Sequence, residues 1–437
     1  MDIDQKIENL IQEIGKEYTT LPYVYLNDDT FQPGKSTVLY NSPYWSHEEA
    51  IAGIKSLLLS KWLVGGSDTH LFETKFARAI NDKYALLVNS GSSANLVMIA
   101  AIKKMKAWPD GSEILTGAVG FPTTLSVLPQ NNLVPVFLDV ELDSLNIDIS
   151  QIEKKITPKT VAIFLSPAMG NPPDMDYILD ICRIHKITLI LDGCDSLGSK
   201  WRGKFLNEYA LATSESLYPA HILSVIQGGI VSSSDKELIT LARSFAQWGK
   251  KCFCQSVQNL LPNGACGERF KGWLYPVYEE VVDHRYVFGE MGYNLIPPEL
   301  CGSIGLEQLK KMDEVFDKRK KNHKIVSNLF LKYIDGIRLP TKLEYSDPVW
   351  FGNGIICENK ELKHKLVAYL ERCKIQTRNL FGGNLLIQPG FSHLGNFKDY
   401  PNSNQILSLV FFTGCPPHYG PNILNYIEDV LSKFKNE

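Results

Sequence analysis

The stretch from Ile187 to Ser199, ITLILDGCDSLGS, decides the fold class of this chain. It opens with a largely apolar run that ends at Asp192 and continues into a Gly-Cys-Asp turn. Because a continuous apolar run fits a strand that is buried on both faces, the stretch predicts a strand inside a parallel sheet. The polar residues just after it are then expected at the carboxyl edge of the sheet, where open α/β sheets bind their ligands.

Similar runs recur on both sides of this stretch. They are YALLV (84–88), LVPVFLDV (133–140), TVAIFLS (160–166) and GGIVSSS (228–234). Amphipathic segments such as 93–105 and 174–187 lie between them and supply the helical crossovers that parallel strands require. The pattern predicts an α/β fold with a large, doubly wound and mostly parallel sheet.

The domain organisation follows from where the alternation of apolar runs and amphipathic segments begins and ends. Residues 1–60 are predicted to form an N-terminal helical or extended segment, and residues 61–300 the large domain. Residues 249–293, rich in Cys, Gly, Pro and aromatic residues, indicate a functional insertion in that domain. Residues 301–437 are predicted to form a connecting helix and a smaller α/β domain.

Charge and hydropathy limit the kinds of partner that the protein is expected to bind. The 437 residues carry a net charge of −3 with acidic and basic side chains interleaved, so neither nucleic acid nor a membrane is an expected partner. The acidic start MDIDQKIENL does not resemble a secretory signal, and no apolar run approaches the roughly 18–20 residues of a membrane span. These features predict a cytoplasmic protein that acts on a small molecule.

Two turns near predicted strand ends carry groups suited to a bound cofactor. VNSGSSAN places Gly91 and Ser92 at a helix N-terminus, where amides, hydroxyls and the helix dipole favour a phosphate. GAVGFPTT places Phe121 where its ring could cover a planar ligand. Taken alone, each motif is also explained by ordinary helix capping or by packing.

The stretch SESLYPAHILSVIQGGIV (214–231) holds Ser216, Tyr218 and His221 between two apolar runs. A lone histidine is more often structural than catalytic. Asp192, taken alone, is likewise explained as a turn former. The order and separation of all these motifs must therefore decide whether they form a site.

In that order, the motifs within about residues 62–387 resemble the DegT/DnrJ/EryC1/StrS family of pyridoxal-phosphate aminotransferases, which act on nucleotide-activated keto sugars. The resemblance implies the fold type I architecture of aspartate aminotransferase. It also implies a homodimer, in which an asparagine of one subunit reaches the cofactor phosphate of the other. The cofactor-binding residues implied are Asp192 for the pyridine nitrogen, Gly91, Ser92 and Ser216 for the phosphate, Phe121 for the ring face, and Asn294 from the neighbouring subunit.

His221 stands where these aminotransferases carry the lysine that forms the Schiff base. An imidazole cannot form that imine, so the cofactor is expected to bind non-covalently, most usefully as pyridoxamine 5′-phosphate rather than pyridoxal phosphate. This exchange resembles the sugar 3-dehydrases, which remove the C3 hydroxyl of a nucleotide-linked 4-keto-6-deoxyhexose. Asp195 and Tyr218, at positions where aminotransferases usually carry histidines, point the same way. The catalytic residues implied are His221, Asp192, Tyr218 and Asp195.

Nine cysteines without a secretion signal favour metal or redox chemistry over disulfides. Cys194, Cys252, Cys254 and Cys266 are expected to hold a [2Fe–2S] cluster, with a structural zinc as the alternative. They resemble the iron–sulfur dehydrase of 3,6-dideoxyhexose biosynthesis, which acts on CDP-4-keto-6-deoxy-D-glucose, although the gap between Cys254 and Cys266 departs from that pattern. The resemblance implies an NADH-dependent flavin and iron–sulfur reductase as partner, because deoxygenation requires two electrons.

The substrate side leaves alternatives open. Arg378 could meet a diphosphate or a sugar hydroxyl, whereas Gln227 and Ser166 depart from the family pattern and leave the sugar and its nucleotide undefined. One alternative is a cluster-free dehydratase of the GDP-colitose type. Another is an ordinary sugar aminotransferase that uses Lys200 or Lys204, and a third is a non-catalytic protein that kept the fold.

Overall fold

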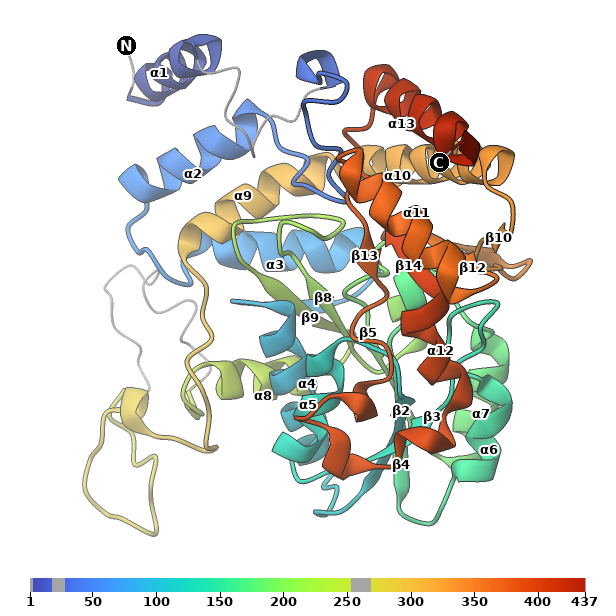
Figure 1. The fold of residues 1–437 in the computed structure, drawn as a ribbon. Coiled ribbons are helices and arrows are strands. Elements are labelled where there is room, and N and C mark those ends of the chain that lie inside the picture. Colours follow the sequence, from blue (N-terminus) through green and yellow to red (C-terminus); the bar gives the residue numbers. More distant parts are fainter. Residues whose placement is uncertain (1–2, 18–27, 253–268, 437) are drawn as a thin grey trace.

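The computed structural model describes residues 3–17, 28–252 and 269–436 (Figure 1). Within these ranges a seven-stranded sheet has the order β1-β9-β8-β5-β4-β2-β3. β9 pairs antiparallel with β1 and β8, and the other neighbours pair in parallel. The strands are β1 (Tyr84–Val88), β2 (Glu113–Gly117), β3 (Val134–Leu138), β4 (Thr160–Leu165), β5 (Thr188–Asp192), β8 (Thr213–Ser216) and β9 (Gly229–Ser233). The predicted α/β fold with a mostly parallel sheet is confirmed.

Burial of apolar side chains explains most of these strands. β4 and β5 are apolar and almost completely buried, as expected for strands covered on both faces. β8 is different, because it reads Thr-Ser-Glu-Ser and all of its residues are buried. Its backbone is satisfied by β5 on one side and β9 on the other, so the ladders hold a strand that no apolar run marks.

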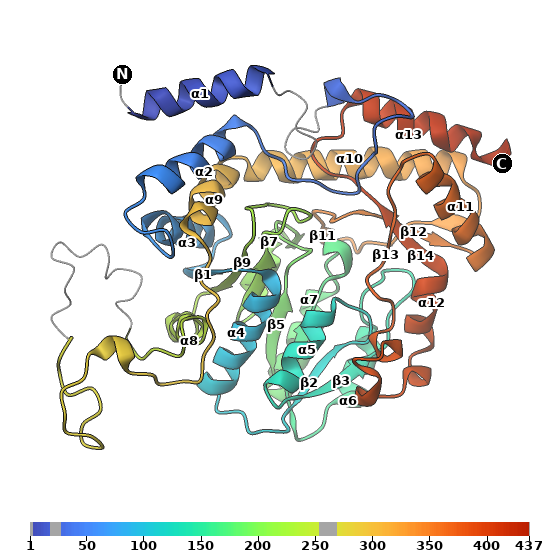
Figure 2. The ribbon, with the colours of Figure 1, turned by 60° about the vertical axis from the view of Figure 1, so that its left-hand side comes forward.

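Helices cover both faces of the large sheet (Figures 1 and 2). Because successive strand residues point to opposite faces, Leu86 and Ile190 pack with one group of helices while Leu87 and Leu191 pack on the other face. The first face carries α4 (Gly91–Met105), α5 (Pro122–Gln130) and α8 (Lys236–Ala246). The second carries α3 (Ser67–Ala79), α6 (Ile152–Lys155), α7 (Met175–His185) and α9 (Glu299–Lys310).

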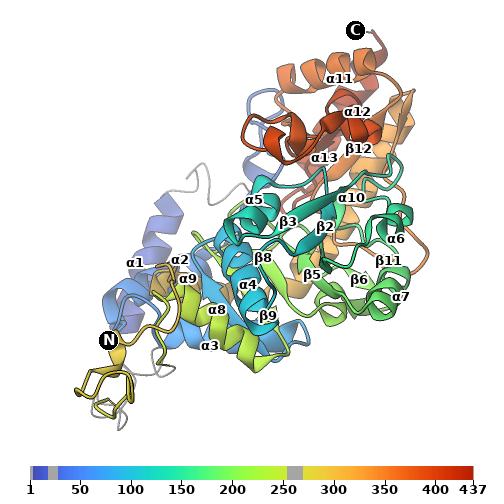
Figure 3. The same cartoon turned by 90° about the horizontal axis from the view of Figure 1, so that it is seen from below.

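A second sheet gathers at one end of the molecule with the C-terminal helices (Figure 3). Its order is β10-β12-β14-β13, with an apolar core of its own between the sheet and the helices. The elements are α10 (Met312–Tyr333), β10 (Ile337–Arg338), β12 (Asn353–Cys357), α11 (Lys360–Arg372), β13 (Arg378–Asn379), α12 (Pro401–Leu409), β14 (Val410–Thr413) and α13 (Pro421–Lys433). A small sheet of β6 (Lys200–Trp201), β7 (Lys204–Phe205) and β11 (Ser346–Asp347) joins the two parts of the chain.

Two segments lie outside these layers. α1 (Ile3–Glu17) runs above α2 (His47–Leu59) (Figure 2). Residues 269–289 extend away from the body of the chain (Figures 1 and 2). Among the helices described, none has the length and apolar character needed to cross a membrane.

Candidate active site

A cavity of about 410 Å³ lies at the carboxyl edge of the large sheet, facing residues of the second sheet. The ends of β5 and β8 and the first turns of α4 and α5 form one wall, and β13, β14 and Phe351, two residues before β12, contribute to the other. The structure brings ten of the predicted site residues to this cavity. They are Gly91, Ser92, Phe121, Asp192, Cys194, Asp195, Ser216, Tyr218, His221 and Arg378.

Asp192 ends β5 and is buried against the cavity. Its Oδ2 accepts hydrogen bonds from Nδ2 of Asn95 at 2.8 Å and from Oγ1 of Thr124 at 2.6 Å. Its Oδ1 accepts a hydrogen bond from the backbone N–H of Cys194 at 3.2 Å. Since a buried carboxylate is costly without donors, these three contacts stabilise it and hold it in one orientation.

The start of α4 lies against the end of β8. A Cβ atom added to Gly91 would come within 2.8 Å of Cβ of Ser216 and 2.9 Å of Sγ of Cys194, so only glycine permits this approach. The hydroxyl of Ser92 lies 2.9 Å from that of Thr123. A helix N-terminus surrounded by hydroxyls is a suitable site for an anion such as a phosphate.

Aromatic rings and one cation lie around the same cavity. Phe121 is 52% exposed and makes an edge contact with Phe381, with ring centres 6.4 Å apart. The guanidinium of Arg378 lies 4.3 Å from the centre of the Tyr40 ring. Tyr218 is also largely exposed. These groups suit a ligand with a planar part and a negatively charged part.

His221 lies in the loop between β8 and β9, and its ring faces the cavity. Nδ1 is 2.9 Å from the backbone oxygen of Cys194, which can only accept, so Nδ1 carries the hydrogen and Nε2 keeps its lone pair. Burial lowers the pKa of His221 to about 4, although the hydrogen bond to Cys194 and the charge of Asp192 act in the opposite direction. The imidazole is therefore neutral at pH 7 and offers an unprotonated nitrogen.

Acidic groups that retain their protons surround the turn after β5. Burial, and secondarily the charge of Asp192, raise the pKa of Asp195 to about 7. The same two causes raise the pKa of Glu215 well above its usual range. They also raise the pKa of the Cys194 thiol well above its usual range. Oδ1 of Asp195 lies 3.6 Å from Nδ1 of His221, and its buried Oδ2 has no hydrogen-bond partner within the described residues. Asp195 thus brings a buried oxygen, unpartnered among the described residues, to the wall of the cavity.

Two further predicted residues that the structure describes, Asn294 and Cys252, do not line the cavity. Asn294 is exposed, pairs through its backbone with Gln247 and is absent from the cavity lining. Cys252 is buried and also absent from that lining. Cys254 and Cys266 lie outside the described residues. Across residues 3–17, 28–252 and 269–436, no group of three or more His, Cys, Asp or Glu side chains is placed to hold a metal ion.

Several residues at the site were not predicted from the sequence. Asn95 and Thr124 support Asp192, and their signal was present, since each lies within the first turns of a helix that begins at a predicted ligand-binding turn. Tyr40 and Phe351 reach the cavity from distant segments. No local pattern marks those two residues.

Comparison with known proteins identifies the family of the chain. A model described as the DegT/DnrJ/EryC1/StrS aminotransferase family matches residues 45–432. The chain belongs to this family. The resemblance drawn from the ordered motifs is confirmed at that level.

Relatives within the DegT/DnrJ/EryC1/StrS family include dehydratases. The dTDP-4-dehydro-2,6-dideoxy-D-glucose 3-dehydratase of Saccharopolyspora spinosa is 34% identical over 417 residues, which cover 93% of this chain and 88% of that protein. The lipopolysaccharide biosynthesis protein RfbH of Salmonella typhimurium is 34% identical over 385 residues, 86% of each chain. A solved structure, E. coli GDP-4-keto-6-deoxy-D-mannose-3-dehydratase with bound hydrated PLP, has a TM-score of 0.76 and 28% identity, and the match covers 90% of this chain and 100% of that chain.

The raised pKa of Asp195 predicts how stability depends on pH. Because the folded chain keeps this proton up to about pH 7 and an unfolded aspartate loses it near pH 4, the contribution of Asp195 to the free energy of unfolding should fall as pH rises from 4 to 7. Asp195→Asn removes that contribution. The cofactor-free variant should be more stable than wild type by about 2–4 kcal/mol at pH 8 and equal to it within about 1 kcal/mol at pH 4.

Urea titrations at several pH values measure this difference. Asp317→Asn, at an exposed position of α10, is the control and should leave the pH dependence of wild type unchanged. A constant difference between Asp195→Asn and wild type from pH 4 to 8 would contradict the buried, protonated state of Asp195.

Proposed function

We propose that this protein is a pyridoxamine phosphate-dependent 3-dehydratase that removes the C3 hydroxyl of a nucleotide-linked 4-keto-6-deoxyhexose. One observation carries the proposal: His221 faces the cavity beside Asp192 and Asp195, and none of the described residues lining that cavity is a lysine. An aminotransferase needs a lysine there to hold its cofactor as an imine. Relatives named as 3-dehydratases, in Saccharopolyspora spinosa and Yersinia pseudotuberculosis, support the same reaction class.

The residues of the cavity fit the cofactor. Asp192 would hold the pyridine nitrogen, the Gly91 turn with Ser92 and Ser216 would hold the phosphate, and Phe121 would cover the ring. The close approach at Gly91 and the unpartnered Oδ2 of Asp195 are independent signs of a built ligand site. When bound, pyridoxamine phosphate supplies an amine for the sugar ketone and a ring that accepts electrons.

The chain's own residues hold and move protons. Nε2 of His221 is the proton acceptor at neutral pH, because Nδ1 is committed to the carbonyl of Cys194 and burial keeps the ring neutral. Once protonated, the same nitrogen is the donor to the oxygen that leaves C3 of the sugar. Asp195 would contact the cofactor or the sugar through its unpartnered oxygen, and Tyr218 would close the mouth of the cavity.

The substrate would be recognised by its charge and its planar base. Arg378, stacked on Tyr40, would meet the diphosphate or a sugar hydroxyl. We propose CDP as the nucleotide, with dTDP as the alternative that the Saccharopolyspora spinosa relative favours. The pathway would be one of dideoxysugar biosynthesis.

A [2Fe–2S] cluster held by Cys194, Cys252, Cys254 and Cys266 is the second part of the proposal. Cys194 supports it, because its sulfur lies beside Gly91 at the wall of the proposed cofactor site. Cys252 is buried at the start of the predicted insertion. When bound, the cluster supplies electrons one at a time, so two electrons from NADH would arrive through a flavin and iron–sulfur reductase.

We further propose a homodimer in which Asn294 acts on the partner's cofactor phosphate. The segment just before Asn294 exposes large apolar side chains that a monomer would leave in water. Val277 is 94% and Met291 96% exposed, and Tyr275 and Tyr286 are 69% and 73% exposed. Asn294 itself lies outside the cavity of its own chain, as expected if it serves a second copy.

Replacing the proposed base tests the reaction. His221→Asn should lower two rates by at least about 10²-fold: exchange of the C4′ hydrogen of bound pyridoxamine phosphate, and loss of the C3 oxygen from the sugar. The reason is that, among the described residues lining the cavity, no second side chain is an imidazole. Mass spectrometry of the cofactor after incubation in deuterated water measures the exchange. Mass spectrometry of CDP- and dTDP-linked 4-keto-6-deoxyhexoses, incubated with a reductase and NADH, measures the loss of the C3 oxygen. His393→Asn, at an exposed histidine, is the control. Undiminished exchange in His221→Asn would refute the assigned role.

Iron analysis tests the cluster. After anaerobic reconstitution the wild type should hold about two irons per chain and give an EPR signal on reduction. Cys194→Ser should lose most of this iron, whereas Cys182→Ser, at a buried cysteine of α7, should retain it. A wild type that converts the substrate without iron would instead be a cluster-free dehydratase.

Mixed dimers test the contribution of Asn294. His221→Asn and Asn294→Ala chains should each be inactive alone, but a dimer of one of each contains one site with both wild-type residues. Co-expression should therefore restore about a quarter of wild-type activity by random pairing. Co-expressed chains as inactive as each variant alone would place Asn294 at its own subunit's site, and an Asn294→Ala chain that is active alone would place it outside any site.

A further inference from the structure

The loop that carries His221 has no regular structure of its own. Residues 217–228 join β8 to β9 without a helix or strand, and their internal backbone hydrogen bonds include Val225 N–H to Leu217 and His221 N–H to Tyr218, both at 2.9 Å. A Schiff-base lysine is fixed covalently to its cofactor, whereas an imidazole is not. The direction of the His221 ring must therefore come from contacts outside the loop.

Arg319, on α10, is the side chain placed to supply those contacts. It is completely buried, and its terminal nitrogens donate four hydrogen bonds to carbonyl oxygens of described residues. Its nitrogens donate to the backbone oxygens of His221 at 3.3 Å and Phe351 at 3.1 Å. The rings of these two residues pack together, with centres 5.2 Å apart. One rigid, planar group thus holds the backbone on both sides of the ring pair.

Asn41 extends this clamp to the residue before His221. Its Oδ1 accepts a hydrogen bond from Arg319 at 2.8 Å, and its Nδ2 donates to the backbone oxygen of Ala220. The two side chains therefore hold successive carbonyl groups of the loop. The remaining bond of the Arg319 fork, at 3.3 Å, goes to the backbone oxygen of Trp350, next to Phe351.

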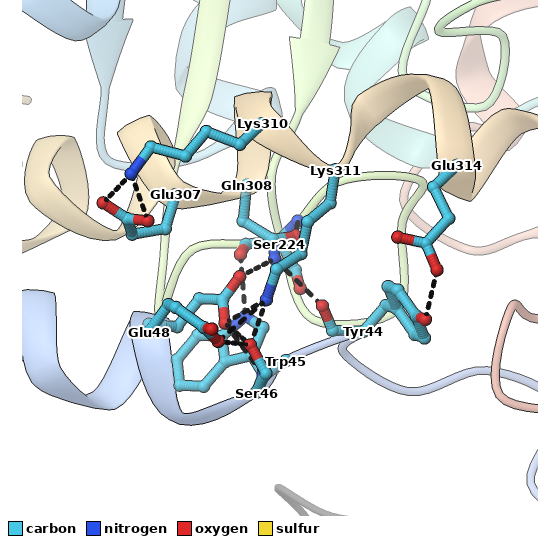
Figure 4. A network of polar contacts seen from close by, with 11 residues as sticks. Tyr44, Trp45, Ser46, Glu48, Ser224, Glu307, Gln308, Lys310, Lys311 and Glu314 are labelled. Atoms are coloured by element: carbon cyan, nitrogen blue, oxygen red, sulfur yellow. Dashed lines mark hydrogen bonds and ion pairs between the residues drawn. The ribbon is translucent and has the colours of Figure 1, made fainter.

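A second network holds the far side of the same loop (Figure 4). Nε1 of Trp45 donates to the backbone oxygen of Ser224 at 2.9 Å, and Oε1 of Gln308 accepts from the backbone N–H of Ser224 at 3.1 Å. Gln308 in turn donates to the buried carboxylate of Glu49 and to the backbone of Tyr44. The segment 41–49 thus lies along the loop and is bonded to it on both sides of His221.

We propose that Arg319 and Asn41 are positioning residues that direct Nε2 of His221 into the cavity. The proposal rests on the proposed function, since it assigns a role to the groups around that base. Arg319 fixes the backbone of His221 and its aromatic neighbour, Asn41 fixes the preceding carbonyl, and the carbonyl of Cys194 fixes the ring tautomer. Because misplacement by about 1 Å can cost about 10²-fold in rate, loss of this clamp should act on turnover more than on binding.

Charge and geometry can be separated at this position. The charged and titratable groups around His221 are Asp192 and Asp195 from the end of β5 and the turn after it, and Arg319 from α10. Arg319→Lys keeps the positive charge but loses the planar fork, whereas Arg319→Met removes both. Because the fork is lost in both variants, both should lose the clamp, whatever charge remains.

Two measurements test the proposal. In Arg319→Lys and Asn41→Ala, kcat for hydrogen exchange at C4′ should fall about 10–100-fold with KM for the nucleotide sugar changed by less than about threefold. ¹⁵N NMR of histidine-labelled, cofactor-free protein should show a single Nδ1–H form of His221 in wild type and a mixture of tautomers in both variants. Arg319→Met, which also lacks the planar fork, should give the same mixture of tautomers.

Arg243→Lys is the matched control. Arg243 is a largely buried arginine of α8 that pairs with Glu73, away from the cavity, and its variant should change kcat and the His221 signal by less than about twofold. One outcome would refute the positioning role alone: His221→Asn abolishes exchange, but Arg319→Lys and Asn41→Ala keep the wild-type kcat and the wild-type tautomer of His221. The proposed role of His221 as the base would then be retained. If His221→Asn retains exchange, the proposed function itself fails, even where the NMR signals change.

Discussion

The hydrogen bonds that Asn95 and Thr124 donate to Asp192 are the contacts on which the rest of the site depends. A carboxylate at the end of a fully buried strand is stable only where donors meet it, and these two come from the first turns of α4 and α5. The same contacts fix both helix starts at the end of β5. The positions of Ser92 and Phe121 at the cavity follow from that arrangement.

Around this anchor, burial controls the protons. The imidazole of His221 is kept neutral, and the carboxyl group of Asp195 retains its proton to about pH 7, because both lie in a region where charge is costly. Between their two pKa values neither group is charged. A neutral base beside a protonated acid is an arrangement suited to proton transfer near neutral pH.

Much of the site could be predicted because it is local in the sequence. Asp192, Gly91, Ser92 and Phe121 each end a strand or lie at a helix start, so the rule that ligands bind at the carboxyl edge marks them as candidates. Their order along the chain, which resembles that of a known family, then gave them their expected roles. Arg319, Asn41 and Phe351 could not be selected in this way. They approach His221 from segments far away in the chain, and an arginine on a mixed-charge helix gives no sign that it is completely buried. β8 could not be predicted from the sequence either, since its Thr-Ser-Glu-Ser sequence has no apolar pattern.

By itself the sequence determined the class of sheet, the residues at its edge and the family of the chain, because apolar runs and the turns that follow them are properties of neighbouring residues. Only the tertiary structure decided whether His221 is a core residue or faces a site. Its burial, the carbonyl that selects its tautomer and the guanidinium that holds its backbone come from three different parts of the chain. Such contacts form when the strands and helices pack together, so no local pattern encodes them.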